Sequence, residues 1–204
     1  MENTRGYTLL EMVLALAVIV VLLGIFVPAV LKYIDEARTG RAHREVEALG
    51  EAINLFNSQL AVPPGWLSGD SLLPSSPFVD LLITDEGVMP GTSGAAAADW
   101  SLGSRVQGAD GGYDFLENHV QLNTSSYPIS GRFRWRGPYL DSVNADPWGN
   151  NYLVNVEFAK PGAPQNAVFV LSAGPDGAVS TAYSQALTAS GITLSGDDIG
   201  FRLR

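Results

Sequence analysis

A long apolar run near the N-terminus constrains the fold of this chain more than any other feature. The 25 residues from Tyr7 to Leu31 contain a single side chain that is charged at neutral pH, Glu11. As an α-helix the run would be about 37 Å long, which exceeds the roughly 30 Å hydrocarbon core of a bilayer. The sequence therefore predicts one membrane-spanning helix.

A cleaved secretory signal peptide is the main alternative for such a run. Signal peptides carry a shorter apolar region that follows a basic stretch and ends in a small-residue cleavage site. Here the run continues through Pro28, Ala29 and Val30 into an amphipathic pattern, with no such site evident. We therefore expect the apolar segment to be retained.

Composition excludes several classes of function. The chain has 204 residues, which is enough for one domain with an appended segment. Its 12 Lys and Arg residues against 21 Asp and Glu give a net charge of −9, so a nucleic-acid partner is not expected. Because there is no Cys, disulfides, thiolate metal sites and a Cys nucleophile are excluded.

The helical pattern continues over residues 32–62 with an amphipathic period. Apolar or small residues recur at spacings of three and four and predict one buried face: Ala42, Val46, Leu49, Ile53, Phe56 and Leu60. The helix should end near Pro63 and Pro64, after about 50 residues. His43 is expected on its exposed surface.

The residues at the start of the apolar run form a motif. The sequence Arg5-Gly6-Tyr7-Thr8-Leu9-Leu10-Glu11 resembles the processing motif of type IV pilins and type II secretion pseudopilins, with Tyr7 in place of the usual Phe. The resemblance implies that a prepilin peptidase removes residues 1–6 by cleaving between Gly6 and Tyr7 and methylates the new terminus. It also implies a homo-oligomeric filament with other pseudopilins, built on an inner-membrane assembly platform.

The basic residues beside the apolar run bear on which side of the membrane the C-terminal part lies. Arg5 precedes the run, whereas four basic residues follow it: Lys32, Arg38, Arg41 and Arg44. The positive-inside rule would place the C-terminal part in the cytoplasm. We give the rule less weight because acidic residues interleave with these bases and because the motif implies a single-pass inner-membrane protein with a periplasmic head.

Glu11 requires a reason to lie in an apolar helix, since an acidic residue there costs about 3 kcal/mol. The resemblance implies that Glu11 pairs with the terminal amine of Tyr7 on a neighbouring subunit and sets the axial register between subunits. The residues alone also allow a capping box between Thr8 and Glu11. Both arrangements remain open, and they can hold at different stages.

Gly24 and Pro28 weaken the helix at one turn. Pro28 lacks the N–H that would bond to the carbonyl of Gly24. The resemblance implies a flexible or locally melted segment that lets helices pack in the fibre core. The alternative is a simple kink tolerated in a membrane helix.

The rest of the chain predicts an α+β head. Residues 63–131 are rich in Pro, Ser, Gly and Ala and are expected to form a variable, loop-rich region, with His119 on its surface. Residues 132–204 are expected to form a small antiparallel sheet packed on the long helix, a pilin-like fold.

Two patterns predict the strands of that sheet. The alternation from Arg132 to Arg136 predicts a strand that buries Phe133 and Trp135 and exposes three arginines. Two further runs, 151–158 and 167–171, flank a turn-rich segment and predict an antiparallel hairpin.

Motifs in the last third of the chain narrow the resemblance. Gly137-Pro138-Tyr139-Leu140 and the stretch from Asp146 to Tyr152 resemble elements of the major pseudopilin of type II secretion, a protein G-like family. We assign these elements structural roles, since Asp-Pro and Gly-Asn are turn sequences and Trp148 is a packing residue.

Two acidic turns resemble the calcium-binding loop of the same family: residues 172–177 and 196–200. By motif position, the implied ligands are the side chains of Asp176, Asp197 and Asp198 and the carbonyls of Ala173 and Ala178. Calcium prefers such hard oxygens. Twenty residues separate Asp176 from Asp197, so the intervening chain must loop out. The alternative is that both turns are ordinary surface turns.

We therefore predict a structural subunit of a type II secretion pseudopilus, with no catalytic residues, that drives protein export. A type IV pilus subunit for adhesion or motility shares the N-terminal motif and is one alternative. A membrane-anchored periplasmic enzyme or binding domain is another. The sequence contains no Ser/His/Asp set, His-based metal cluster or phosphate loop to support it.

Overall fold

The computed structural model describes residues 7–68, 76–103, 105–187 and 191–203. The chain divides into two compact units, Met1–Thr39 and Gly40–Arg204. One α-helix, α1 (Leu9–Leu60), contributes to both. The leader expected over residues 1–6 lies outside the described residues.

In the first unit, α1 carries apolar side chains that its own chain does not cover. Every described residue from 7 to 38 is exposed, and Leu14 and Phe26 expose 66% and 62% of their surface. The helix is long and apolar enough to cross a membrane. The segment predicted to span the bilayer, residues 7–31, lies almost wholly within it.

In the second unit, α1 buries the face that its periodicity predicts. All six positions of the predicted stripe are buried: Ala42, Val46, Leu49, Ile53, Phe56 and Leu60. His43 is exposed, as expected. The helix ends at Leu60, and the next residue, Ala61, adopts a left-handed conformation with φ of 58°. The helix therefore has 52 residues and ends just before Pro63.

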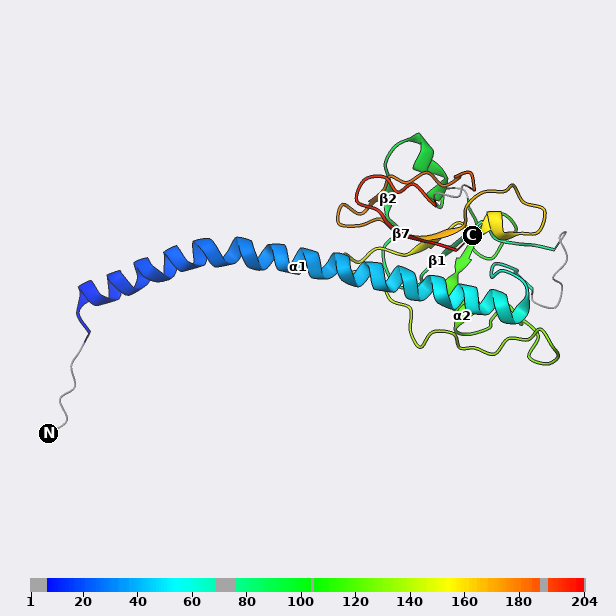
Figure 1. The fold of residues 1–204 in the computed structure, drawn as a ribbon, viewed down its shortest axis with the longest axis horizontal. Helices are drawn as coiled ribbons and strands as arrows, with labels where there is room; N and C mark the ends of the chain where they lie inside the picture. Colours follow the sequence, from blue (N-terminus) through cyan, green and yellow to red (C-terminus); the bar gives the residue numbers. More distant parts are fainter. Residues whose placement is uncertain (1–6, 69–75, 104, 188–190, 204) are drawn as a thin grey trace. The chain divides into compact units, whose positions relative to one another are not determined.

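The buried stripe belongs to the same core as a mixed five-stranded sheet, in which the strand order is β3-β1-β4-β5-β7. Figure 1 labels two of these strands, β1 and β7, in the head that contains the second half of α1. The strands are β1 (Leu81–Ile83), β3 (Tyr113–Phe115), β4 (Leu153–Val154), β5 (Phe169–Ser172) and β7 (Ile199–Arg202). β1 and β3 are parallel, whereas the other three pairings are antiparallel. The fold is α+β and pilin-like, with a sheet that is mixed rather than wholly antiparallel.

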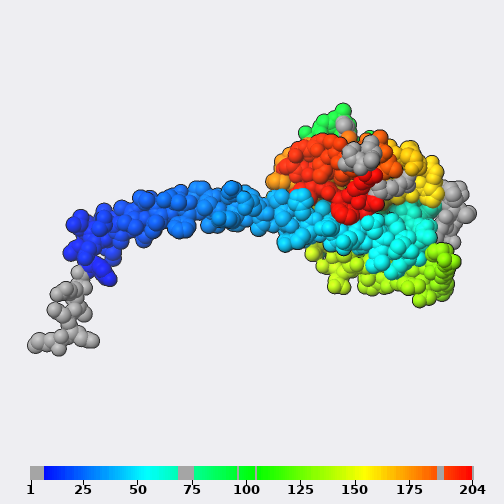
Figure 2. Space-filling view, viewed as in Figure 1, coloured from blue at the N-terminus to red at the C-terminus, as the bar shows by residue number. Residues whose placement is uncertain are grey.

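The close approach of β7 to α1 depends on Gly50. A Cβ atom at this position would overlap the ring of Phe201, so the absence of a side chain lets the strand reach the helix. Figure 2 shows the C-terminal residues, in red, against the second half of α1, in cyan. The C-terminal strand is thus part of the packing of the head.

The segment predicted as loop-rich, residues 63–131, contains more regular structure than expected. It holds β1, β3, β2 (Gly91–Thr92), the 3-10 helix η1 (Ala95–Trp100) and α2 (Leu116–Val120). β2 pairs in parallel with β6 (Ala178–Val179). Trp100 anchors the segment, because its buried ring packs on Phe169 and Tyr183 and its Nε1 donates a 2.8 Å hydrogen bond to the carbonyl of Thr181.

The antiparallel hairpin is confirmed, with shorter strands than the pattern indicated. Leu153 pairs with Leu171 and Val154 with Val170. The chain then enters the 3-10 helix η2 (Val156–Ala159). Residues 151–156 are all buried, because the core covers both faces of this segment. Its alternating sequence therefore does not correspond to one buried and one exposed face.

The strand expected over Arg132–Arg136 is wrong. The segment is irregular, and Phe133 exposes 51% of its surface. Trp135 is partly buried and donates from Nε1 to the carbonyl of His119 at 3.0 Å. The exposure of the three arginines is confirmed. A strand that buries Phe133 would need a neighbouring strand, and the alternating pattern of these five residues does not show whether one is present.

Candidate functional site

The N-terminus of α1 is closed by a capping box. The carboxylate of Glu11 accepts hydrogen bonds from the backbone N–H of Thr8 at 2.9 Å and from its hydroxyl at 3.0 Å. The Thr8 hydroxyl in turn accepts from the backbone N–H of Glu11 at 3.2 Å. The capping alternative is therefore present in the single chain, and pairing with a neighbouring subunit stays a prediction.

The processing site straddles the edge of the described region. Gly6 lies outside the described residues, and Tyr7 exposes 82% of its surface. Gly24 and Pro28 both lie within α1, which continues through them. A Cβ atom at Gly24 would meet nothing within 4 Å, so its neighbourhood within the single chain is open.

The structure brings the two acidic turns together despite the twenty residues between them. The backbone N–H of Asp176 donates to Oδ2 of Asp197 at 3.1 Å, while Oδ1 of Asp176 accepts from the N–H of Ala178 at 2.8 Å. Gly174, at φ of 70°, lies so close to the carbonyl of Asp197 that a Cβ atom there would clash. Of the intervening chain, Tyr183 is buried in the core rather than looped out, and residues 188–190 lie outside the described residues.

Asp198 is the most enclosed carboxylate of this site, with 7% of its surface exposed. Its Oδ2 accepts from the backbone N–H groups of Ser180 and Thr181 at 2.9 and 2.6 Å. Its Oδ1 is buried and has no hydrogen-bond partner among the described residues. Burial raises the pKa of Asp198, which would not be expected of an ordinary surface turn.

The carboxylate oxygens of the two turns are ligands of the kind that a hard cation binds, but they do not form a complete coordination shell. Within the described part of the chain, no three His, Cys, Asp or Glu side chains converge as a metal-binding group. The unpartnered oxygen of Asp198 and the contact between Asp176 and Asp197 are the features that suit calcium. Carbonyl oxygens, such as those predicted for Ala173 and Ala178, would have to complete the coordination.

Asp146 ties the Asp-Pro-Trp-Gly turn to the start of the acidic loop. Its Oδ1 accepts from the N–H groups of Trp148 and Asn150 at 3.0 and 2.8 Å. Its Oδ2 accepts from the hydroxyl of Ser172 at 2.7 Å, and that hydroxyl accepts from the N–H of Gly174 at 3.2 Å. The turn sequence predicts a structural role, but no pattern in the sequence indicates the hydrogen bonds that join Asp146 to Ser172.

Comparison with known proteins finds two family models and a curated relative. A family model described as "Type II secretion system (T2SS), protein G" matches residues 118–189. A model described as "Prokaryotic N-terminal methylation motif" matches residues 1–27. A similar curated protein is the "Type II secretion system core protein G" of Escherichia coli (strain K12). It is 26% identical over 180 residues, which cover 88% of each chain.

The chain is thus similar to the pseudopilins of type II secretion at both its N-terminal motif and its head. No solved structure matches it. The similarity to pseudopilins supports a structural subunit of a pseudopilus. The protein G match ends at residue 189 and so includes Asp176 but not Asp197 or Asp198.

His119, expected on the surface, is wholly buried. Its Nδ1 lies 2.8 Å from the hydroxyl of Tyr127, and its Nε2 lies 3.3 Å from Oδ2 of Asp114. The backbone N–H of Gly65 also donates to Nδ1, at 3.4 Å. The residue joins α2 to distant loops, a structural role that a lone His in a weak pattern could not indicate.

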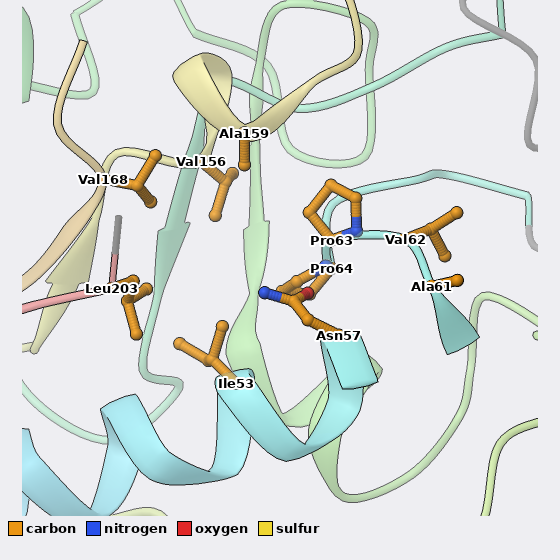
Figure 3. A pocket seen from close by; sticks show the side chains of 10 residues that line it. All are labelled: Ile53, Asn57, Ala61, Val62, Pro63, Pro64, Val156, Ala159, Val168 and Leu203. Carbon is orange, nitrogen blue, oxygen red and sulfur yellow. The ribbon is translucent and has the colours of Figure 1, made fainter. Parts of the chain in front are cut away.

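A cavity of about 270 Å³ lies at the end of α1 (Figure 3). Asn57 supplies its polar side chain, and the other lining residues are Ile53, Ala61, Val62, Pro63, Pro64, Val156, Ala159, Val168 and Leu203. This lining offers no ionisable group or nucleophile. The cavity therefore gives no support to an enzymatic reading of the head.

Proposed function

We propose that this protein assembles through α1 into a periplasmic filament that extends from the inner membrane and drives protein export. The observation that supports the proposal most is the uncovered apolar surface of residues 9–31. Such a surface needs lipid before assembly and neighbouring helices afterwards. The two conditions correspond to a membrane-stored subunit and a filament core.

The bases that follow the apolar run are partly paired along α1, although acidic residues contribute little to the positive-inside rule. Lys32 lies 3.6 Å from Glu36, and Arg41 lies 2.8 Å from Glu45, each one turn further along the helix. These contacts balance two of the four bases that follow the apolar run. The similarity to pseudopilins fits a membrane anchor with a periplasmic head.

We propose that a prepilin peptidase cleaves after Gly6 and methylates Tyr7. The amine released at Tyr7 lies only four residues before Glu11, at the start of the same helix. In the filament, Glu11 would exchange part of its bonding to Thr8 for the amine of a neighbouring subunit. Gly24 and Pro28 would let the helices adjust as they pack.

Two substitutions separate the register role of Glu11 from its capping role. Glu11→Ala should leave the protein in the membrane and strongly reduce the yield of sheared filaments. Thr8→Ala, the matched control, removes the capping hydroxyl but retains the carboxylate, and should cost about 1 kcal/mol of local helix stability while preserving filaments. Normal filament yield from Glu11→Ala would contradict the register role.

We also propose that calcium binds between the two acidic turns. The carboxylates of Asp176, Asp197 and Asp198 and the carbonyls of Ala173 and Ala178 would hold it, and the ion would fix the two turns against each other. At a free concentration of about 100 times its dissociation constant, calcium would stabilise the fold by about 2.7 kcal/mol.

The test is the thermal midpoint of the full chain in detergent, with calcium or with a chelator. Calcium should raise the midpoint of the wild type and of the control Asp141→Asn, whose exposed carboxylate lies outside the site. It should leave Asp176→Asn unchanged. A wild-type thermal midpoint that is unchanged by saturating calcium would contradict the proposed calcium site.

A further inference from the structure

A part of the middle region, residues 91–100, is bonded to the chain that lies between the two acidic turns. It is called the β2–η1 segment here, because it contains those two elements. The backbone N–H of Gly91 donates to the carbonyl of Gly177 at 2.9 Å, and the N–H of Ser93 donates to the carbonyl of Val179 at 2.7 Å. These bonds hold one edge of β6, the strand that follows the first acidic turn.

The opposite edge of β6 faces the carboxylates of the acidic turns. The N–H of Ala178 donates to Oδ1 of Asp176 at 2.8 Å, and the N–H of Ser180 donates to Oδ2 of Asp198 at 2.9 Å. In a β-strand the N–H and C=O of one residue point to the same edge, and those of the next residue point to the other edge. The carbonyl of Ala178, an expected calcium ligand, therefore points away from β2 and toward the carboxylates.

Trp100, at the end of the β2–η1 segment, fixes the residue that holds Asp198. Its Nε1 donates to the carbonyl of Thr181 at 2.8 Å. The N–H of Thr181 donates to Oδ2 of Asp198 at 2.6 Å, and its hydroxyl accepts from the N–H of Ser195 at 3.0 Å. With Oδ2 held in this way, Oδ1 of Asp198 is buried and has no hydrogen-bond partner among the described residues.

The chain just before β2 is bonded to the Asp-Pro-Trp-Gly turn as well. The N–H of Val88 donates to the carbonyl of Gly149 at 2.9 Å, and the N–H of Asn151 donates to the carbonyl of Val88 at 3.0 Å. That turn is joined in its turn to the first acidic turn through Asp146 and Ser172. The middle region is therefore bonded to two segments that contact the first acidic turn.

We propose that the β2–η1 segment positions the acidic turns for the cation, with Trp100 as a positioning residue that acts through Thr181. The segment orients β6 so that the carbonyl of Ala178 lies on the same edge as the carboxylates before calcium binds. Because the two turns are far apart in the sequence, an unsupported site would have to order its loop on binding, and the segment removes part of that cost. This inference rests on the proposed calcium site.

A substitution that removes one hydrogen bond and keeps the ring tests the role of Trp100. Trp100→Phe retains an aromatic side chain against Phe169 and Tyr183 but loses the Nε1 donor. Isothermal titration of the full chain in detergent with calcium chloride should show a dissociation constant raised by about fivefold or more. A merely structural role would lower the unfolding midpoint in chelator without changing this dissociation constant.

Trp66→Phe is the matched control. Trp66 is also wholly buried and packs edge-on against Phe78, but its Nε1 has no hydrogen-bond partner among the described residues. The substitution therefore removes a similar amount of packing without removing a hydrogen bond. It should leave the calcium dissociation constant at the wild-type value.

A backbone variant keeps the inference testable if Trp100→Phe does not fold. Ser93→Pro removes the N–H that donates to Val179, and it should weaken calcium binding in the same direction. Ser93→Ala retains that N–H and should bind calcium as the wild type does. Equal dissociation constants for these two variants would contradict a positioning role for β2.

The outcomes separate the positioning role from the calcium site itself. A wild-type chain that binds no calcium contradicts the proposed site and this inference with it. Wild-type binding that is unchanged in both Trp100→Phe and Ser93→Pro overturns the positioning role alone. An equal loss of affinity in Trp66→Phe also overturns it, because the loss would then follow from the general stability of the head.

Discussion

The two halves of α1 differ in whether their apolar side chains are covered by the protein's own chain. Residues 9–38 expose their apolar side chains, whereas the half that follows buries a stripe from Ala42 to Leu60 under its own sheet. The second half of α1 is therefore stabilised by the sheet of its own chain, whereas the first half depends on the lipid or protein that surrounds it. Substitutions in the two halves should therefore affect different measurements.

The largest contrast is expected between Phe56 and Phe26. Phe56 is fully buried and packs against Tyr127 at a ring distance of 4.9 Å, so Phe56→Ala should destabilise the head by about 3–5 kcal/mol. Phe26→Ala should leave the head unchanged and act only on membrane insertion or assembly. Urea unfolding of the full chain in detergent measures the head, and equal losses from both variants would break the comparison.

A smaller contrast is expected between the two glycines of the helix. Gly50→Ala places a methyl group where the Phe201 ring lies, and such overpacking should cost about 1–3 kcal/mol of head stability. Gly24→Ala has open space around it and should leave head stability as it is, since Ala only favours the helix locally. The same unfolding assay checks both, and a silent Gly50→Ala would show that β7 does not need the close approach.

A pH-dependent effect is expected at Asp114, within the head. Burial alone would raise the pKa of Asp114, but its contact with His119 and hydrogen bonds from Phe115 and Asn118 lower it below the ordinary value of 3.8. The ionised carboxylate therefore stabilises the fold above that value, and this contribution is lost as pH falls through the lowered pKa.

Asp114→Asn should accordingly cost about 1–3 kcal/mol near neutral pH, and the difference from wild type should shrink in acid. Unfolding midpoints across a pH series give the result. A penalty that is equally large at low pH would assign the loss to packing instead. The pH response of Glu36→Gln, an exposed change in the first unit, should match that of the wild type.

The sequence predicted what depends on local period and missed what depends on distant partners. The helix, its buried stripe and its end before Pro63 follow from spacings of three and four, which are properties of neighbouring residues. β1, β3 and β4 have only two or three residues each. Strands so short are specified by the strands and core that cover them rather than by their own pattern.

The same distinction applies to the candidate sites. The capping box is contiguous in the sequence, so the hydrogen bonds between Thr8 and Glu11 could be predicted from it, whereas processing at Tyr7 stays a prediction. The contact between Asp176 and Asp197 was expected only through family resemblance, because twenty residues separate them. The burial of His119 depends on Asp114 and Tyr127, which no spacing rule links to it.

Intact mass analysis of the protein in sheared filaments tests the central claim most directly. We expect this protein to be present in the filaments, with a chain that begins at an N-methylated Tyr7 and lacks residues 1–6. A filament fraction that lacks the protein, or that contains a chain still beginning at Met1, would contradict the claim that the exposed half of α1 is a processed assembly element.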